Sequence, residues 1–274
     1  MTKKEHFIPR AAYLRGFSNT HWEDDRKNKL NFYNKGSNQF GNSNVYELGF
    51  ENLLYENKDL DDNAVEDFLS EIDGDLVNVF KPIISVCSLP QNNNALVLNG
   101  KTEKDNLKFF VTLQYYRTPK KRDSYNGSKE ERQHAFLTGI IGRADNGEWL
   151  ITRNMNDLSS HYFVFERNET ETPFVISDQP IIIFNSYSDG NDVYNFRFPL
   201  SPFIHAILID PKSSEDNIWR DYRNRLRVIE QGNDHIIDFW NNLALEDSRR
   251  FIYYTTGYDF QMTSDGLKLE TLKS

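Results

Sequence analysis

Four short segments of this 274-residue chain place charged or amide side chains beside proline and apolar residues. A histidine can transfer protons, an arginine fork matches the oxygens of a phosphate group, and an amide or a carboxylate can orient a substrate, a water molecule or a metal ion. Together these side-chain types predict chemistry on a phosphate or phosphodiester group. The segments are His6-x-x-Pro9-Arg10, Gln114-x-x-Arg117-Thr118-Pro119, Ser177-Asp178-Gln179-Pro180 and Arg197-Phe198-Pro199-Leu200-Ser201-Pro202.

Each of these side chains has a role under this hypothesis. His6 is the general acid or base, Gln114 orients the substrate or a water molecule, and Asp178 orients His6 or binds a metal ion. The residues assigned to substrate binding are Arg10, Arg117 and Arg197. If the site uses a divalent metal ion as its cofactor, Glu66 and Asp73 are the candidate carboxylate ligands.

Helical spacing directs the first arginine toward the interior. Pro9 suits the first turn of a helix and Gly16 suits its end, which predicts a helix of about two turns. Arg10, Tyr13 and Leu14 fall on one face of that helix. Because a cation in a first turn faces the positive end of the helix dipole, we expect an anionic partner for Arg10.

A longer helix is predicted over residues 103–117. It is apolar on nearly every side, which is typical of a central buried helix, and Gln114 and Arg117 continue one of its apolar faces. Burying a guanidinium group is unfavourable unless the group is paired. We therefore expect either a carboxylate or a ligand anion beside Arg117.

The same residues fit a purely structural interpretation equally well. Asp178, Glu66 and Asp73 are available as partners of the buried arginines. Internal salt bridges would then tie the helical half of the chain to the sheet without forming a binding site.

The order of the remaining elements indicates an α+β fold. A hairpin or a loop is predicted over residues 30–44, a helix from Asp62 to Pro82, and another helix over residues 129–143. A last helix is predicted over residues 234–254. The predicted strands are Trp149–Thr152, Tyr162–Phe165, Phe174–Ser177, Ile181–Phe184 and Phe203–Ile209.

These elements predict a helical N-terminal half packed on a small, mostly antiparallel sheet, with C-terminal helices. Residues 1–145 are expected to form the mainly helical part with its early hairpin or loop, and residues 146–274 the sheet and the final helices. The length of the chain fits one compact unit.

Composition narrows the functional classes. The net charge of −9 argues against a generally basic nucleic-acid coat protein, although a local basic patch can bind phosphate within an acidic protein. The single cysteine, Cys87, cannot form an internal disulfide and is predicted to be a small buried hydrophobe. The N-terminus lacks the apolar run of a signal peptide, and no segment is apolar over the length of a membrane span. We therefore expect a cytoplasmic protein that does not enter membranes.

Several familiar signatures are missing from the sequence, namely the phosphate-binding loop, the dinucleotide glycine fingerprint, paired-cysteine zinc spacing, HExxH and Gly-x-Ser-x-Gly. Common cofactor enzymes and acyl-transfer enzymes are therefore disfavoured. His205, in a strand-like run, is predicted to be a core residue rather than a catalyst.

A family resemblance accompanies these motifs. The segments that carry it are His6-x-x-Pro9-Arg10-x-x-Tyr13-Leu14, Leu113-Gln114-Tyr115-Tyr116-Arg117-Thr118-Pro119, Ser177-Asp178-Gln179-Pro180, Phe198-Pro199-Leu200-Ser201-Pro202 and the late helix around Asn241, Ala244 and Arg250. In this order they resemble the bacterial domain of unknown function 4238 family over almost the whole chain. The resemblance implies kinship and supplies no activity.

The leading functional hypothesis is an enzyme that acts on nucleotides or phosphodiesters, such as an RNase or DNase effector of a bacterial defence or toxin system. A second hypothesis is a non-catalytic module that binds a nucleotide, a nucleic-acid end, another phosphate-containing ligand or a phage protein. In the third, the protein is structural and its arginines only stabilise the fold.

Overall fold

A five-stranded sheet forms the centre of the structure. The structure is a computed structural model, and it describes residues 4–18, 27–52, 54–55, 64–90, 93–143, 145–146, 150–188, 191–263 and 266–271. Its outermost pair, β10 with β5, is parallel, and its other neighbouring strands run antiparallel, so the fold is a mixed α+β fold, as predicted. In spatial order the strands are β10 (Leu226–Ile229), β5 (Tyr162–Asn168), β9 (Ile204–Ile209), β8 (Asn191–Ser201) and β7 (Ile182–Ser188).

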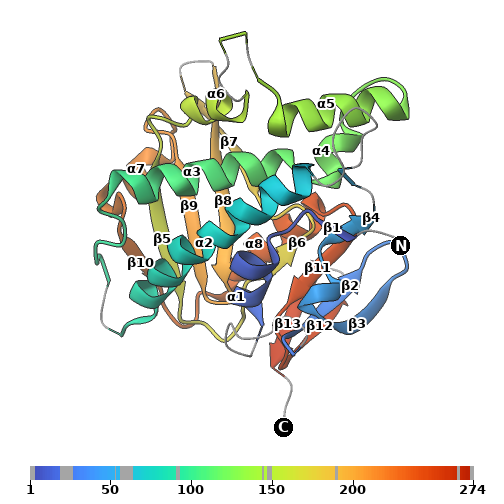
Figure 1. The fold of residues 1–274 in the computed structure, drawn as a ribbon. Helices are drawn as coiled ribbons and strands as arrows, with labels where there is room; N and C mark the ends of the chain where they lie inside the picture. The colour runs from blue at the N-terminus through green and yellow to red at the C-terminus, as the bar shows by residue number, and fades with distance from the viewer. Residues whose placement is uncertain are drawn as a thin grey trace.

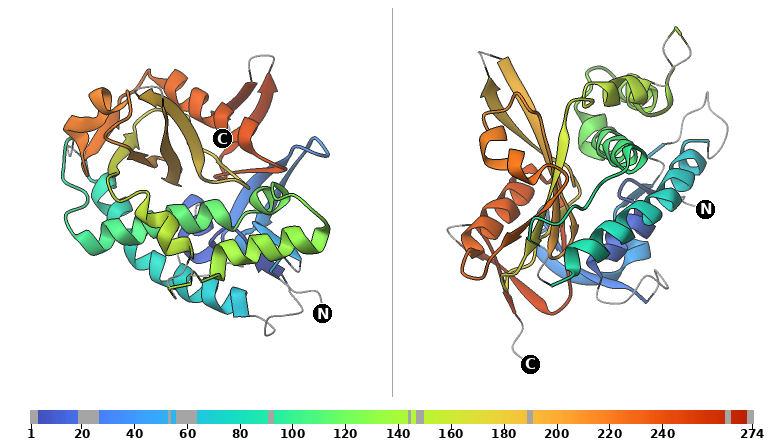
Figure 2. Two further views of the ribbon diagram at one scale, coloured as in Figure 1. Left: turned by 90° about the horizontal axis from the view of Figure 1, so that it is seen from above. Right: turned by 90° about the vertical axis from the view of Figure 1, so that its left-hand side faces the viewer.

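Helices cover both faces of this sheet. Figure 2 shows α2 and α3 on one side of the sheet and α7 and α8 on the other, so the molecule has three layers. The helices are α1 (Arg15–Phe17), α2 (Ala64–Ser88), α3 (Lys101–Tyr116), α4 (Pro119–Asp123), α5 (Lys129–Ile141), α6 (Leu150–Asn156), α7 (Asp216–Trp219) and α8 (Asp234–Asp247), with a π-helical turn η1 (Arg10–Leu14) and two 3-10 turns, η2 (Val45–Glu47) and η3 (Arg220–Tyr222). None of the helices in the described ranges combines the length and the apolar character that crossing a membrane requires.

A second sheet joins the two ends of the chain. Its order is β3-β2-β11-β6, and Figure 1 shows the early hairpin of β2 and β3 beside the late strand β11. The hairpin alternative predicted for residues 30–44 is therefore confirmed. The strands outside the five-stranded sheet are β1 (Lys4–His6), β2 (Lys29–Asn34), β3 (Gln39–Asn44), β4 (Phe50–Asn52), β6 (Ile176–Ser177), β11 (Phe251–Tyr254), β12 (Tyr258–Thr263) and β13 (Gly266–Thr271).

Four aromatic rings connect the layers. The Tyr13 ring lies 5.7 Å from that of Phe110 and 6.2 Å from that of Phe80, measured between centroids, and Phe110 lies 5.5 Å from Phe198. These rings come from η1, α3, α2 and β8, and each is at most 1% exposed. The N-terminal turn is thus packed against both long helices and, through Phe110, against the sheet.

Pro82 does not end its helix, contrary to the prediction. α2 continues through it to Ser88. A proline inside a helix costs about 3 kcal/mol because it removes a hydrogen bond and its ring clashes with the preceding turn. The apolar stripe continues past Pro82 with Ile83 and Cys87, which are 3% and 0% exposed, and their burial offsets this cost. The prediction that Cys87 is buried is confirmed.

One other predicted element was wrong in type, and another was too long. Residues 149–152 were predicted to form a strand, but helix α6 begins at Leu150. Ile151 is buried where α6 contacts α3, and this tertiary packing overrides the β propensity of the segment. Trp149 lies outside the described residues. The helix predicted over 234–254 ends at Asp247, and the chain then forms β11.

The turn between α8 and β11 is held by Asp178. Its two carboxylate oxygens accept hydrogen bonds from the backbone N–H groups of Arg249, Arg250 and Phe251, at 2.7–2.9 Å. Burial raises the pKa of this carboxyl group above its ordinary value, although the three N–H donors favour its ionised form. The described contacts of Asp178 therefore redirect the chain from helix to strand.

Candidate functional site

The buried guanidinium group of Arg117 joins three parts of the chain. At the end of α3, its Nε donates to the backbone carbonyl of Phe7 at 2.9 Å, and its two terminal nitrogens pair with the carboxylate of Asp73 in α2 at 2.8 and 3.0 Å. Burial alone would lower the pKa of Arg117, but the charge and hydrogen bonds of Asp73 raise it above its ordinary value. The predicted carboxylate partner is thus present, and it is Asp73.

Gln114 and Tyr55 complete this arrangement. The Gln114 side chain donates to the same Phe7 carbonyl at 2.8 Å. The Tyr55 hydroxyl lies 3.2 Å from the His6 carbonyl and 3.4 Å from that of Arg117, and burial raises its pKa, so it remains a neutral donor. These side chains form the Arg117 network, which consists of Tyr55, Asp73, Gln114, Arg117 and the Phe7 carbonyl.

His6, whose carbonyl accepts from Tyr55 of the Arg117 network, and Arg10 both lie beside Tyr46. The His6 Nε2 is 3.3 Å from the Tyr46 carbonyl, and its ring lies 6.2 Å from that of Tyr46. The Arg10 guanidinium and the Lys4 ammonium each lie 5.0 Å from the centroid of the Tyr46 ring, which is 38% exposed. We call Lys4, His6, Arg10 and Tyr46 the basic-aromatic patch.

Arg197 belongs to a different cluster, on the face of the sheet that α8 covers. Its Nε donates to Nδ1 of His205 at 2.5 Å, it pairs with Glu166, and its guanidinium lies 3.6 Å from the Trp240 ring. Arg227 pairs with the other oxygen of Glu166 at 2.9 Å. His205 is 2% exposed, so the prediction that it is a core residue is confirmed.

The structure therefore brings some of the sequence-predicted residues together and separates others. Glu66 acts electrostatically on Arg117 and Tyr55 and so belongs beside the Arg117 network. Within the described parts of the chain, no group of three or more His, Cys, Asp or Glu side chains is placed to hold a metal ion. The residues brought together are His6, Arg10, Glu66, Asp73, Gln114 and Arg117, and those held elsewhere are Asp178 and Arg197.

A cleft that the sequence did not indicate lies between α3 and the β7–β8 edge of the sheet. Its volume is about 450 Å³. Val193 and Phe196 contribute apolar surface, while Tyr115 and Tyr116 line the α3 side. Its other polar lining residues are Thr112, Asp157, His161, Tyr194 and Asp210, and we call this the His161 cleft.

His161 has an unusual environment in this cleft. Its side chain is 5% exposed, its Nε2 lies 3.0 Å from the Tyr194 carbonyl and 3.9 Å from Asp210, and its buried Nδ1 has no hydrogen-bond partner among the described residues. Burial lowers the pKa of the ring, and the nearby Lys108 acts in the same direction, so the imidazole is neutral at pH 7. Since a neutral imidazole carries one proton, Nε2 donates to Tyr194 and Nδ1 is left as an acceptor.

The strand register explains how His161 and Asp210 meet. Tyr162 at the start of β5 pairs with Ile209 at the end of β9, so the residues just outside the two strands lie opposite each other. Nothing in the sequence identifies this pairing, because the two residues are far apart in the chain and stand in no recognisable motif. A correct register for β5 and β9 would have been the signal needed to find them.

A family model for proteins of unknown function, DUF4238, matches residues 4–257. The chain belongs to this family. The resemblance seen in the motifs is thereby confirmed, and the matched region of this DUF4238 protein contains the Arg117 network, the basic-aromatic patch and the His161 cleft. Comparisons with curated proteins and with solved structures found no match.

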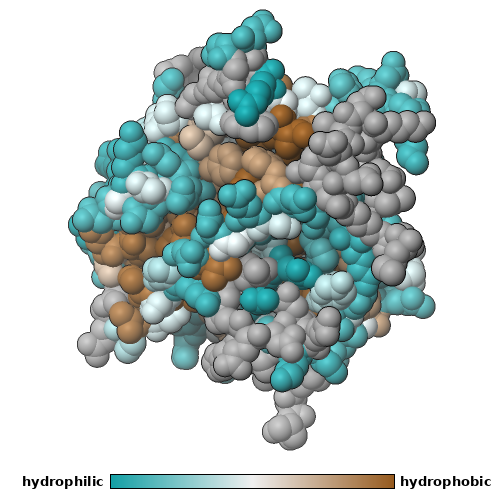
Figure 3. Space-filling view, in the orientation of Figure 1, coloured by the Kyte–Doolittle hydropathy of each residue, from teal (hydrophilic) through white to brown (hydrophobic). Residues whose placement is uncertain are grey.

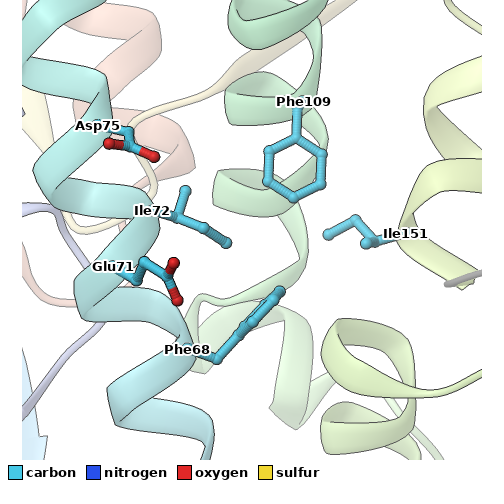
Figure 4. Close-up of a pocket in the computed structure, with 6 residues that line it drawn as sticks. All are labelled: Phe68, Glu71, Ile72, Asp75, Phe109 and Ile151. Carbon is cyan, nitrogen blue, oxygen red and sulfur yellow. The ribbon is translucent and has the colours of Figure 1, made fainter.

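A smaller pocket of about 270 Å³ lies between α2, α3 and α6. Figure 4 shows Ile72, Phe109 and Ile151 pointing toward a common space, with Glu71 and Asp75 on the α2 side. In Figure 3 hydrophobic surface is visible in the upper part of the molecule, in the region of α3 and α6. The described lining of this smaller pocket contains two carboxylates and no histidine, so the His161 cleft of the DUF4238 chain is the better candidate for acid–base chemistry.

Replacing Arg117 by methionine is expected to lower the free energy of unfolding by about 3–5 kcal/mol, because Asp73 is left without its buried partner. The measurement is urea denaturation followed by circular dichroism. Adding Asp73→Leu to Arg117→Met is expected to recover part of the loss. Lys120→Met is the control, since the Lys120–Asp247 pair has side chains that are 45% and 35% exposed. If Arg117→Met costs no more than this control, the Arg117 network does not stabilise the fold.

The stability of the protein is expected to fall between pH 7 and pH 5. Burial lowers the pKa of His205 and His161, so below about pH 6.5 the unfolded chain binds more protons than the folded one, and stability is lost as the pH falls. His205→Asn keeps an acceptor for Arg197 and should make the slope shallower, by up to about 1.4 kcal/mol per pH unit. His235→Asn, at an exposed position of α8, is the control. Equal slopes for wild type, His205→Asn and His235→Asn would contradict the assignment.

Proposed function

We propose that this protein binds a small organic molecule in the His161 cleft and that His161 is the acid–base group of the site. The observation that carries the proposal is the buried Nδ1 of His161, which has no hydrogen-bond partner in the described structure. Leaving a buried polar atom without a partner costs about 1–3 kcal/mol. A ligand that donates a hydrogen bond to Nδ1 removes this cost.

The size and lining of the cleft support the proposal. Small-molecule sites typically measure about 300–1,000 Å³ and combine apolar walls with a few convergent polar groups. The His161 cleft has about 450 Å³, aromatic and apolar walls, and polar side chains from α3, the loop before β5 and the end of β9. Ionisable groups with shifted pKa values gather in such sites, and the pKa of His161 is lowered.

The chemistry that follows is proton abstraction. The lone pair of Nδ1 accepts a proton from an O–H or N–H group of the ligand, and the resulting imidazolium keeps its Nε2–H bond to the Tyr194 carbonyl. Asp210, with its carboxylate 3.9 Å from Nε2, stabilises the positive charge that forms. Lys108 disfavours that charge, so the neutral imidazole is the resting state of the base.

Two substitutions of His161 separate the roles of its nitrogens. In His161→Gln, the side-chain amide can still donate to the Tyr194 carbonyl, but the acceptor at the Nδ1 position is lost. In His161→Asn, an oxygen replaces Nδ1 and the contact with Tyr194 is lost. The measurement is a ligand-observed NMR screen of small aromatic fragments, followed by titration of the hits.

We expect hits whose binding is weakened about tenfold or more by His161→Gln and less by His161→Asn, since one lost hydrogen bond to a buried acceptor costs about 1–3 kcal/mol. Asp75→Asn, in the smaller pocket of Figure 4, is the control and should leave the affinities unchanged. A screen without hits, or hits that are insensitive to both His161 variants, would refute the proposal.

A second candidate function is action on a nucleotide or phosphodiester at the basic-aromatic patch, including the nuclease effector predicted from the sequence. The observation that favours it is the exposed Tyr46 ring with Lys4 and Arg10 beside it, because proteins bind single-stranded nucleic acids by stacking bases on aromatic rings next to cations. In this proposal the Arg117 network acts by holding the backbone of residues 6 and 7 in place.

This second candidate predicts cleavage of RNA, DNA or nucleotides by the purified protein, tested with and without a divalent metal ion. His6→Ala should abolish turnover, and Tyr46→Ala should weaken substrate binding by about 1–3 kcal/mol through loss of stacking. Lys101→Ala, at an exposed position of α3, is the control. If no substrate is turned over and none binds in a Tyr46-dependent manner, the candidate is discarded.

A further inference from the structure

Several polar side chains that line the His161 cleft are hydrogen-bond acceptors, beside three tyrosines whose hydroxyls can both donate and accept. Nδ1 of His161 has only a lone pair to offer, and the carboxylates of Asp157 and Asp210 accept when ionised. The hydroxyl of Thr112 donates to the Lys108 carbonyl at 3.0 Å, which leaves its oxygen as an acceptor toward the cleft. A ligand that pairs with Nδ1 of His161 and with the two carboxylates brings N–H or O–H donors.

The charge of the lining has the same consequence. Asp157 and Asp210 are acidic, and no lysine or arginine is among the lining residues that the structure describes. Lys108 and Lys121 lie near these residues and are engaged, because Lys108 donates to the Ser159 carbonyl at 3.0 Å and the Lys121 ammonium lies against tyrosine rings. Among the described lining residues an anionic ligand would face two carboxylates, whereas a cation would be paired with them.

The tyrosines of the cleft already hold an ammonium group. The Nζ of Lys121 lies 4.9 Å from the centroid of the Tyr115 ring, 5.3 Å from that of Tyr116 and 5.5 Å from that of Tyr125. Tyr115 and Tyr116 also line the cleft, and their rings meet edge to face. Aromatic rings bind cations through the negative charge of their faces, as these two rings do with Lys121.

We propose that the ligand of the His161 cleft is an organic cation with N–H donors, such as an aryl-alkyl amine or a guanidine. Its apolar part lies against Val193 and Phe196, its charge faces Asp157 and Asp210, and one N–H bonds to Nδ1 of His161. This inference rests on the function proposed above, because it names the class of molecule that the same cleft takes.

The test uses four compounds that share one aryl-alkyl body and differ in the end group: a primary ammonium, a trimethylammonium, a hydroxyl and a carboxylate. Affinities are measured by isothermal titration calorimetry at pH 7. The primary ammonium should bind most tightly, because only it combines a positive charge with N–H donors. The trimethylammonium should bind about tenfold more weakly, and the carboxylate most weakly of all.

Variants of the two carboxylates locate the charge. Asp210→Asn keeps the oxygen that accepts from the backbone N–H of Lys212 at 2.9 Å, and Asp157 is exposed, so both variants are expected to fold. Each should weaken the primary ammonium by about tenfold and leave the hydroxyl compound nearly unchanged. Asp75→Asn in the smaller pocket is the matched control and should change neither affinity.

The outcomes separate this inference from the proposal on which it rests. If the hydroxyl or carboxylate compound binds as tightly as the ammonium, with an affinity that depends on His161, the cleft is a ligand site but the cation inference is overturned. If the ammonium binds best but is insensitive to Asp157→Asn and Asp210→Asn, the inference is overturned as well. If none of the four compounds binds in a His161-dependent manner, both the cation inference and the proposed function are refuted.

Discussion

The ion pair between Arg117 and Asp73, together with the bond from Arg117 to the Phe7 carbonyl, is the constraint on which the rest of the structure depends. A fully buried guanidinium is stable only if its donors are paired, so α2, α3 and the N-terminal segment must meet at this point. That meeting places Tyr13 against Phe110 and so packs the first turn against the central helix. It also fixes α3, which forms one wall of the His161 cleft.

The periodicity of α3 explains how one helix serves both places. Thr112, Tyr115 and Tyr116 are spaced three and four residues apart and line the cleft, whereas Gln114 and Arg117 point to the Phe7 carbonyl on another side of the helix. The buried network therefore holds α3 in position, and the cleft uses the side chains that remain. The acid–base group itself comes from the sheet, where the register of β5 and β9 brings His161 and Asp210 together. Stability and ligand binding thus share one helix without sharing side chains.

The features that depend on local residue spacing could be predicted from the sequence. Helical spacing identified Gln114 and Arg117 as inward-facing, and the need to pair a buried arginine pointed to Asp73 among the available acids. The α+β class followed from the order of the elements, and a hairpin was one of the two alternatives predicted for residues 30–44. Tertiary packing determined the features that the sequence did not predict. Arg197 faces α8, on the side of the sheet opposite α2 and α3. Pro82 lies within a helix because apolar residues continue beyond it, and residues 150–156 are helical because Ile151 packs against α3. The His161 cleft depends on strand register, which no spacing in the sequence encodes.

The most direct test of the account is the ¹⁵N NMR spectrum of the histidine ring nitrogens. The chain has six histidines, and comparison with His161→Asn assigns the signals of His161. At pH 7 the account predicts a neutral ring with the proton on Nε2, an unprotonated Nδ1, and a change in the Nδ1 signal when a cleft ligand is added. A proton on Nδ1, or an Nδ1 signal that does not respond to a saturating ligand, would contradict the claim that this nitrogen is the acceptor of a binding site.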